Sequence, residues 1–338
     1  MSPFIFQKYW CIVGQDVIAI VLSILNYGHT LHKMNFTHIV LIRKKNDPKH
    51  MCDCRPKSFS NVISRIISKV LSNRLKHVLP MIIFDAQSAF VPNRLINDNT
   101  TVAYELLHRM RSRRKGRMGY MVVKLDISKA YDGVEWGFLR QIMLKMGFDP
   151  RWVHLAMETI TTASYSILIN AEPQGFINPS RVIRQGYPIS SYLFLLCAEG
   201  LSTMLRKAEE SHNMRGIKSN QHGVCTSHHF FADGSLLFYR ATMEECQRLL
   251  NLWGVYKAAS SQAINRQKTS LFFSKNTKPE VKEAIKQMMG ARIMSNCEKH
   301  LGLPMVSGKS KVNTFKELQE KITKKVMEWK EKFVSKAG

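Results

Sequence analysis

Apolar residues recur with helical spacing over residues 60–79. Steps of one, three or four positions connect Val62, Ile63, Ile66, Ile67, Val70, Leu71, Leu75, Val78 and Leu79, and basic residues occupy other faces. This pattern predicts an amphipathic helix. Helices are also predicted over residues 135–146, 151–162, 190–210, 243–258 and 312–333, and after Pro279.

β-Branched and aromatic runs between turn residues predict the strands. They cover residues 37–44, 118–126 and 269–273, a hairpin-like pair around residues 171–175, and a second hairpin over residues 228–240. In the second hairpin, the pair Asp233–Gly234 suits a tight turn with a positive φ angle. Strands separated by helices of uneven length indicate an α+β fold.

The most apolar early stretch is "VIAIVLSIL", residues 17–25. It is too short to span a bilayer, and Asp16 precedes it as a cap. No small-residue cleavage site of a signal peptide follows. We therefore expect a buried helix and a protein that is not secreted.

Charge is the least ordinary feature of the composition. The chain has 338 residues, with 50 Lys and Arg against 25 Asp and Glu, a formal net charge of +25. Such a surplus indicates a polyanionic partner, with nucleic acid as the leading candidate. No helix concentrates basic charge above a broad apolar face, so a membrane partner is not expected.

The run "RMRSRRKGR", residues 109–117, holds six basic residues. It is either an exposed helix end and loop or a patch that contacts phosphate or serves targeting. The residues alone do not choose between these.

Seven cysteines at irregular spacing make a disulfide framework unexpected and favour a reducing, intracellular compartment, nucleus or cytoplasm. Cys52 and Cys54 form only a C-x-C pair, which is a poor zinc site.

Two acids, Asp126 and Asp233, stand at the ends of predicted strands. Carboxylates at strand ends can converge on divalent metal, as phosphoryl transfer requires. By position alone the signal is weak, because Asp at a strand end is often only a turn former.

The segments around these acids are more specific. In chain order, "KLDISKAYDGVEW", "RQGYPISSYLFLLCAEGLS" and "FFADGSLLF" resemble the palm motifs of reverse transcriptases from non-LTR (LINE-type) retrotransposons. "THIVLIRK", "CRPKSFSNVISRIISKVLSNRLK" and "AQSAFVPNRLINDNT" are similar to that family's fingers, and "INRQKTSLFFS" and "HLGLP" to its later palm and grip. The resemblance spans roughly residues 10 to 310.

The resemblance implies a right-hand polymerase fold of palm and fingers, with an antiparallel palm sheet packed with helices. It implies residues 1–36 as an N-terminal helical extension, 37–117 as fingers, 118–275 as palm with the metal site, and 276–338 as grip and start of the thumb. The family's endonuclease would lie before residue 1, and its C-terminal region is not expected in this chain.

Roles at matching positions follow from the resemblance. Asp126, the carbonyl of Ile127 and Asp233 would hold Mg²⁺ (Mn²⁺ is possible), and Lys268 would donate a proton to the leaving pyrophosphate. Four residues would contact the incoming nucleotide: Arg55, Tyr131, Gln185 and Gly186. RNA template, DNA primer and deoxynucleoside triphosphates are the implied partners.

Several positions depart from the family's pattern. Gly234 stands where the hairpin normally carries a second Asp, so the site is expected to lose one metal ligand. Other departures are Tyr187 for an acid, Ser191 for Pro, Arg43 for Pro, Lys57 for an apolar residue and Ser261 for a turn Gly. We therefore expect an impaired reverse transcriptase, with a non-catalytic nucleic-acid-binding remnant of a transposon-derived reading frame as the alternative.

Overall fold

The computed structural model describes residues 3–28, 34–128, 130–218, 225–294, 299–300, 303–304, 316 and 319–327. Its contacts group the chain into two compact units, each assembled from separate stretches. The first comprises Met1–Arg94, Ile127–Lys207 and Asn251–Ile264, and the second Leu95–Asp126, Ala208–Leu250 and Asn265–Gly338. The four-part division expected from the sequence stays a prediction.

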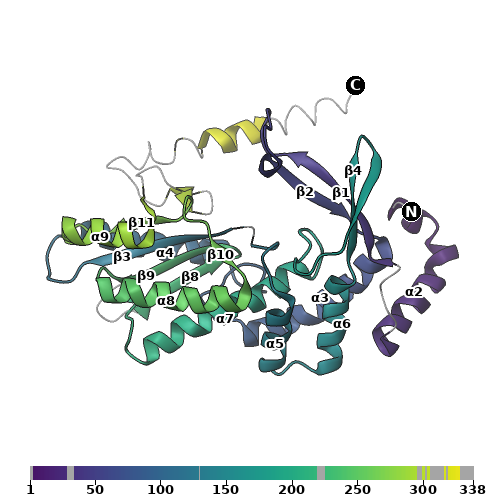
Figure 1. Cartoon of the computed structure of the whole chain (residues 1–338), viewed down its shortest axis with the longest axis horizontal. Helices are drawn as coiled ribbons and strands as arrows, with labels where there is room; N and C mark the ends of the chain where they lie inside the picture. Colours follow the sequence, from purple (N-terminus) through teal and green to yellow (C-terminus); the bar gives the residue numbers. More distant parts are fainter. Residues whose placement is uncertain are drawn as a thin grey trace. The chain divides into compact units, whose positions relative to one another are not determined.

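The first unit contains a four-stranded mixed sheet (Figure 1). Its order is β2 (Cys54–Phe59), β1 (Phe36–Arg43), β4 (Ser164–Ile169) and β5 (Glu172–Ile177). β1 pairs antiparallel with β2 and parallel with β4. The predicted hairpin turns through Asn170 and Ala171, with φ angles of 52° and 68°. Positive φ at both central residues matches the turns that suit the twist of a hairpin.

Helices of the first unit follow the predicted periodicity. They are α1 (Pro3–Lys8), α2 (Trp10–Tyr27), α3 (Val62–Ile82), α5 (Trp136–Lys145), α6 (Pro150–Thr161) and most of α7 (Ser190–Glu210). Asn61 caps α3, because its side-chain oxygen accepts a hydrogen bond from the Ile63 amide at 3.0 Å. Leu71, Leu75 and Leu79 on the apolar face are fully buried.

The early apolar stretch differs from expectation. Asp16 lies inside α2 and does not cap it, because Trp10 and the following residues already continue the helix. Only one face is buried, at Gly14, Val17, Val21 and Ile24. Within the described residues, α2 is the one helix whose length and composition would suffice to cross a membrane, and 28% of it is buried.

The second unit contains the sheet that carries both acids. Its strand order is β12 (Arg292–Ile293), β11 (Ser270–Phe273), β3 (Tyr120–Ser128), β9 (Gly234–Arg240) and β8 (His228–Phe231). All neighbours pair antiparallel except β11 and β12. β3 is therefore flanked on both sides, and its positions 121–123 are completely buried.

Helix α4 (Ile96–Ser112), which periodicity did not predict, supplies the core of the second unit. Its Ala103, Leu106, Leu107 and Met110 pack with strand residues including Phe238. The remaining elements are α8 (Met243–Ser260), α9 (Pro279–Met289) and the short strands β6 (Ile217–Lys218), β7 (Cys225–Thr226), β10 (Ala263–Ile264), β13 (Lys299–His300) and β14 (Leu303–Pro304).

These elements confirm the α+β class. Of the helix predicted over residues 312–333, positions 316 and 319–327 are helical, and the other positions lie outside the described residues.

His229 on β8 is half-buried, although both nitrogens of its ring are shielded from solvent. Neither ring nitrogen makes a hydrogen bond within the described part of the chain, and the ring meets Phe238 edge-on at 6.1 Å. Burial lowers the pKa of His229 to about 4 from 6.5. In the unfolded chain the ring takes up a proton below pH 6.5, whereas in the folded chain it stays neutral until about pH 4.

We therefore predict that the protein loses stability as pH falls from 6.5 to 4, by roughly 3 kcal/mol from this group. His229→Leu should remove that part of the dependence, as measured by urea unfolding at pH 7 and pH 4.5. His154→Gln, at an exposed position of α6, is the control and should leave the pH dependence as it is. Equal pH dependence of native protein and His229→Leu would contradict the prediction.

Ser261 ends α8 in a conformation that favours glycine. Its φ is 59°, and its amide donates to the Lys257 carbonyl at 2.9 Å. The sequence analysis interpreted Ser261 as a replacement for a turn Gly, and the left-handed backbone at this position is consistent with that interpretation.

We predict that Ser261→Gly raises the free energy of unfolding by about 1 kcal/mol, because the left-handed backbone is less strained for Gly. The matched control is Gly28→Ser, at the end of α2, where φ is 71° and an added Cβ atom meets no atom within 4 Å. That variant should lose a similar amount. Chemical denaturation measures the free energy of unfolding of both variants, which should rise for Ser261→Gly and fall for Gly28→Ser.

Candidate active site

The β3–β9 ladder brings the two acids to one place. Asp126 on β3 lies directly opposite Gly234, the first residue of β9, and Asp233 precedes Gly234 in the hairpin turn. In an antiparallel pair, side chains of opposite residues share one face about 5 Å apart. A side chain at position 234 would therefore stand beside that of Asp126.

The hairpin turn is not the one expected from Asp–Gly. The register pairs Phe231 with Gly234, so the two turn residues are Ala232 and Asp233. The positive φ falls on Ala232, at 52°, and the φ of Gly234 is not positive. The expectation that Gly234 serves the turn is wrong, because the turn lies one residue earlier.

Space at position 234 leads to the same conclusion. A Cβ atom added to Gly234 would meet only the Phe231 carbonyl oxygen, at 3.4 Å. This is an ordinary contact distance, and neither backbone nor packing requires glycine there.

Asp126 is partly buried in this arrangement, with 38% of its side chain exposed. Its pKa is raised, first by burial and also by the nearby negative charge of Asp233, whereas Lys268 lowers it. The Lys268 Nζ atom lies 4.0 Å from Asp126 Oδ1. The structure therefore places all three predicted catalytic residues in one cluster.

Asn265, which the sequence analysis did not single out, positions Lys268. The Asn265 amide donates to the Asp126 carbonyl at 2.8 Å. The Asn265 side-chain oxygen accepts from the Lys268 amide at 3.3 Å, and its carbonyl accepts from Thr269. Asn commonly forms such local turns, and that propensity was the only available sequence signal.

The predicted nucleotide contacts Tyr131, Gln185 and Gly186 belong to the first unit. The Ile183 amide donates to the Tyr131 carbonyl at 2.9 Å, which joins the two segments. Tyr131 stacks on Phe194 with ring centres 5.2 Å apart. Gly186 has a φ of 82° and open space around it, so glycine is required there by the backbone.

A buried cation supports this segment. Arg184 lies 4.6 Å over the Tyr187 ring and donates to Asn35, which in turn donates to Thr162 at 2.8 Å. Gln185 and Gly186 are exposed at the surface next to this anchor.

Tyr187 packs against α3 in the first unit. It is 4% exposed, and its hydroxyl donates to the Ser64 carbonyl on α3 at 2.8 Å. Tyr187, which stands for an acid of the family pattern, therefore lies in the packed interior of the first unit, where an acid would bury a charge.

Arg55 lies exposed on β2, opposite Ile42. Nearby Arg43 and Lys57 are also exposed and keep their strand pairings. These substitutions therefore leave the ladder intact.

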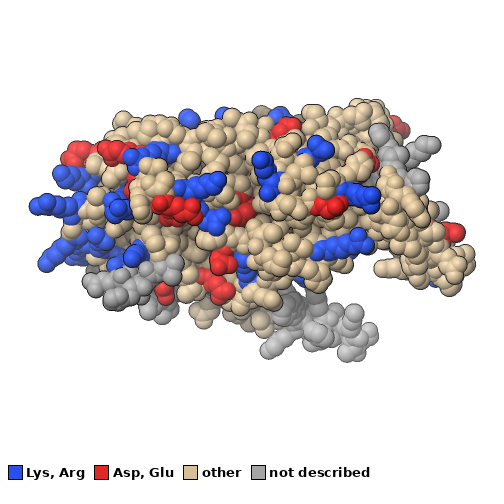
Figure 2. Space-filling view, turned by 90° about the horizontal axis from the view of Figure 1, so that it is seen from below, with Lys and Arg blue, Asp and Glu red and all other residues tan. Residues whose placement is uncertain are grey.

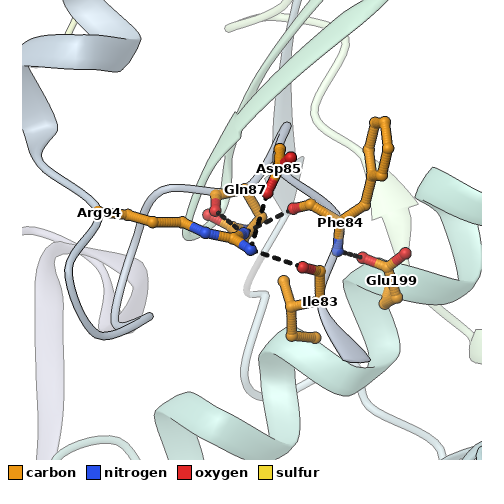
Figure 3. A network of polar contacts seen from close by, with 6 residues as sticks. All are labelled: Ile83, Phe84, Asp85, Gln87, Arg94 and Glu199. Carbon is orange, nitrogen blue, oxygen red and sulfur yellow. Dashed lines mark hydrogen bonds and ion pairs between the residues drawn. The ribbon is translucent and has the colours of Figure 1, made fainter. Parts of the chain in front are cut away.

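Arg94 holds a loop that periodicity could not predict (Figure 3). Its guanidinium donates to the carbonyls of Ile83, Phe84 and Gln87 at 2.7–2.8 Å and pairs with Asp85 at 3.1 Å. From the other side, Glu199 of α7 accepts from the Phe84 amide at 3.1 Å. The segment "AQSAFVPNR" is thereby fixed on the first unit.

Asp126 and Asp233 supply the hard oxygen ligands that Mg²⁺ prefers. Burial is the main reason that the pKa of Asp126 is raised, and Lys268 lowers that pKa more than the charge of Asp233 raises it. Among the described residues, no group of three or more His, Cys, Asp or Glu could hold a metal ion. The described residues therefore present two carboxylate side chains here, one fewer than the family pattern.

Comparison with known proteins identifies the family. The profile described as "Reverse transcriptase (RNA-dependent DNA polymerase)" matches residues 42–318, so this chain belongs to the reverse transcriptase family. Members of this family typically use divalent metal and act on nucleic acid.

Two relatives are proteins of transposable elements. The chain is 29% identical over 265 residues to the "Transposon TX1 uncharacterized 149 kDa protein" of Xenopus laevis, covering 78% of this chain and 20% of that protein. It is 25% identical over 178 residues to the R2 retrotransposable element Pol polyprotein of Popillia japonica, covering 51% and 24%. The chain thus resembles non-LTR retrotransposon reverse transcriptases and spans about a fifth to a quarter of these relatives.

A solved structure, apo telomerase from Candida tropicalis truncated from its C-terminal domain, aligns with a TM-score of 0.49 and 11% identity. The alignment covers 73% of this chain and 51% of that one.

The cluster makes a prediction about the pKa of Asp126. Lys268→Gln should raise it, because a nearby positive charge is removed, and Asp233→Asn should lower it, because a nearby negative charge is removed. Carboxyl-carbon NMR titration measures both shifts. Lys278→Gln, exposed at the start of α9, is the control and should leave the pKa unchanged. Shifts of the same sign in both test variants would contradict the described geometry.

Proposed function

We propose that this chain is an RNA-directed DNA polymerase whose catalysis is weakened by the lost carboxylate at Gly234. The observation that carries the proposal is the register. Asp126 faces Gly234 across the ladder, and Asp233 adjoins it. A family acid at position 234 would lie on the same face as Asp126.

Each residue has a defined part in this proposal. Asp126, the Ile127 carbonyl and Asp233 would hold Mg²⁺ or Mn²⁺, which when bound stabilises the attacking and leaving oxygens of phosphoryl transfer. Lys268 would give a proton to the pyrophosphate oxygen that leaves. Its side chain is 69% exposed, so the ammonium can reach a substrate that arrives from solvent.

The first unit would bind the nucleotide. Tyr131 would lie under the incoming sugar, with Gln185 and Gly186 as the floor of the pocket and Arg55 on the triphosphate. The exposed backbone at Gly186 supports a close approach by a ligand.

RNA template, DNA primer and deoxynucleoside triphosphates would be the substrates. An intracellular location, in the nucleus or cytoplasm, is supported by the free state of Cys11, Cys54, Cys197, Cys225 and Cys246. The assignment of residues 37–117 to fingers and 118–275 to palm belongs to the same proposal.

The second candidate function is nucleic-acid binding without catalysis. The observation that favours it is the two-carboxylate site, in which Lys268 already stands near Asp126. Both candidates require a net positive protein, so charge does not separate them.

Gly234→Asp separates them. Because the backbone accepts a side chain there, this variant should fold, bind Mg²⁺ more tightly and raise primer extension by about 10²–10³, the usual effect of one electrostatic contact in a catalytic site. Primer extension on an RNA template with Mg²⁺, and Mg²⁺ titration by calorimetry, measure the change.

Gly234→Asn is the matched control, since it has nearly the same size without the charge, and Asp126→Asn is the inactive reference. Native activity equal to that of Gly234→Asp would refute impairment at this position. Activity of Gly234→Asp no higher than that of Asp126→Asn would favour the non-catalytic function.

A further inference from the structure

A basic cavity lies in the second unit, away from the acid pair. It has a volume of about 750 Å³. Five cationic residues line it, and they are Arg109, Arg113, Arg215, Lys218 and Arg240. A second concavity of about 520 Å³ adjoins it and is lined by residues 109 and 112–115 of the basic run.

The cavity is distinct from the candidate active site. It is lined by Tyr120 and Arg240, which pair with one another at the far end of the β3–β9 ladder. Asp126 lies six positions further along β3. At about 3.3 Å per residue, the two ends are about 20 Å apart.

The charge of the cavity is not balanced from within. Its two acidic residues are Glu209 and Glu210. Glu209 accepts a hydrogen bond from Ser227 at 2.7 Å, and burial raises its pKa. No ion pair of the described residues involves Arg109, Arg113 or Arg215. Clustered cations repel each other, and an anionic ligand would relieve that repulsion.

The side chain of Arg113 is fixed in a position from which it can bind an anionic ligand. Its guanidinium lies 4.6 Å over the Tyr120 ring, and its Nε atom is buried without a hydrogen-bond partner. A planar guanidinium fixed in this way can offer paired N–H groups to a phosphate.

The basic connection between α4 and β3 is anchored as well. Asn276 donates to the carbonyls of Gly116 and Met118 at 3.1 and 2.8 Å. Ser274 accepts from the Tyr120 amide at 2.8 Å. In Figure 2, Lys and Arg gather at the left end of the view, where Figure 1 draws this connection and α9.

We infer that this cavity is a second nucleic-acid site, which grips the sugar–phosphate backbone of RNA about 20 Å from the acid pair. The inference rests on the proposed function only in taking RNA as the polyanion. Its role is to retain the RNA, and it takes no part in the chemistry.

The test compares the full chain with Arg109→Gln/Arg113→Gln. The control is Arg140→Gln/Arg151→Gln, which removes the same charge from exposed positions of α5 and α6. Fluorescence anisotropy measures binding of a short single-stranded RNA over a salt titration. Losing two phosphate contacts should make the log–log salt slope shallower by about 1.4. The control should keep a steeper slope than the cavity variant.

A footprint locates the site independently of affinity. Phenylglyoxal modifies accessible arginines, and mass spectrometry identifies them. Bound RNA should protect Arg109, Arg113 and Arg215. Arg113→Lys keeps the charge without the planar fork and should weaken binding less than the double variant. Unfolding curves verify that each variant folds.

The outcomes separate this inference from the proposed function. RNA that binds without protecting these arginines, with equal slopes for both double variants, overturns the inference and leaves the polymerase proposal standing. If Arg109→Gln/Arg113→Gln binds RNA as the native chain does and changes only nuclear accumulation, the inference is also overturned. The basic run at residues 109–117 is then a targeting signal. Primer extension by the native chain on a pre-annealed template tests the polymerase proposal separately.

Discussion

The antiparallel register between β3 and β9 is the constraint on which the chemistry of this protein depends. It sets Asp126 opposite the first residue after the hairpin turn and leaves the turn itself to Ala232 and Asp233. A shift of one residue would turn every side chain of β9 to the other face and bring Phe238 out of the core. Core packing by α4 therefore fixes the position of the acids.

The sequence predicted what depends on local pattern. Helices α3 and α7 appear where periodicity placed them, and hairpins form at residues 164–177 and 228–240, although both turns lie earlier in the chain than the turn residues indicated. Asp126, Asp233 and Lys268 lie near one another, as the family resemblance implied, although their roles stay predictions. The resemblance to reverse transcriptases, which the sequence motifs indicated, is confirmed by the family profile over residues 42–318.

What the sequence could not predict depends on distant contacts. α4 was missed because its polar stretch "INDNTT" hides a buried face that only the sheet reveals. Nothing in the sequence distinguishes Arg94 and Arg184 from other basic residues. Yet Arg94 anchors a loop through the Phe84 carbonyl, ten positions away, and Arg184 does so through Asn35, which is far along the chain. The turn at residues 232–233 was misplaced because Asp–Gly usually forms the turn itself, whereas here strand pairing begins at Gly234.

The left-handed conformation at Ala232 has a consequence for how such a chain can change over generations. Since the turn is made before position 234, folding places no demand on which small residue stands there. Asp and Gly codons differ at one nucleotide, so a single replacement can remove the acid while the protein folds as before. Chaperones and proteases act on unfolded protein, so they would not remove a chain that has lost only this acid. Because the fold does not depend on the residue at position 234, a change from Gly back to Asp would also leave the fold as it is.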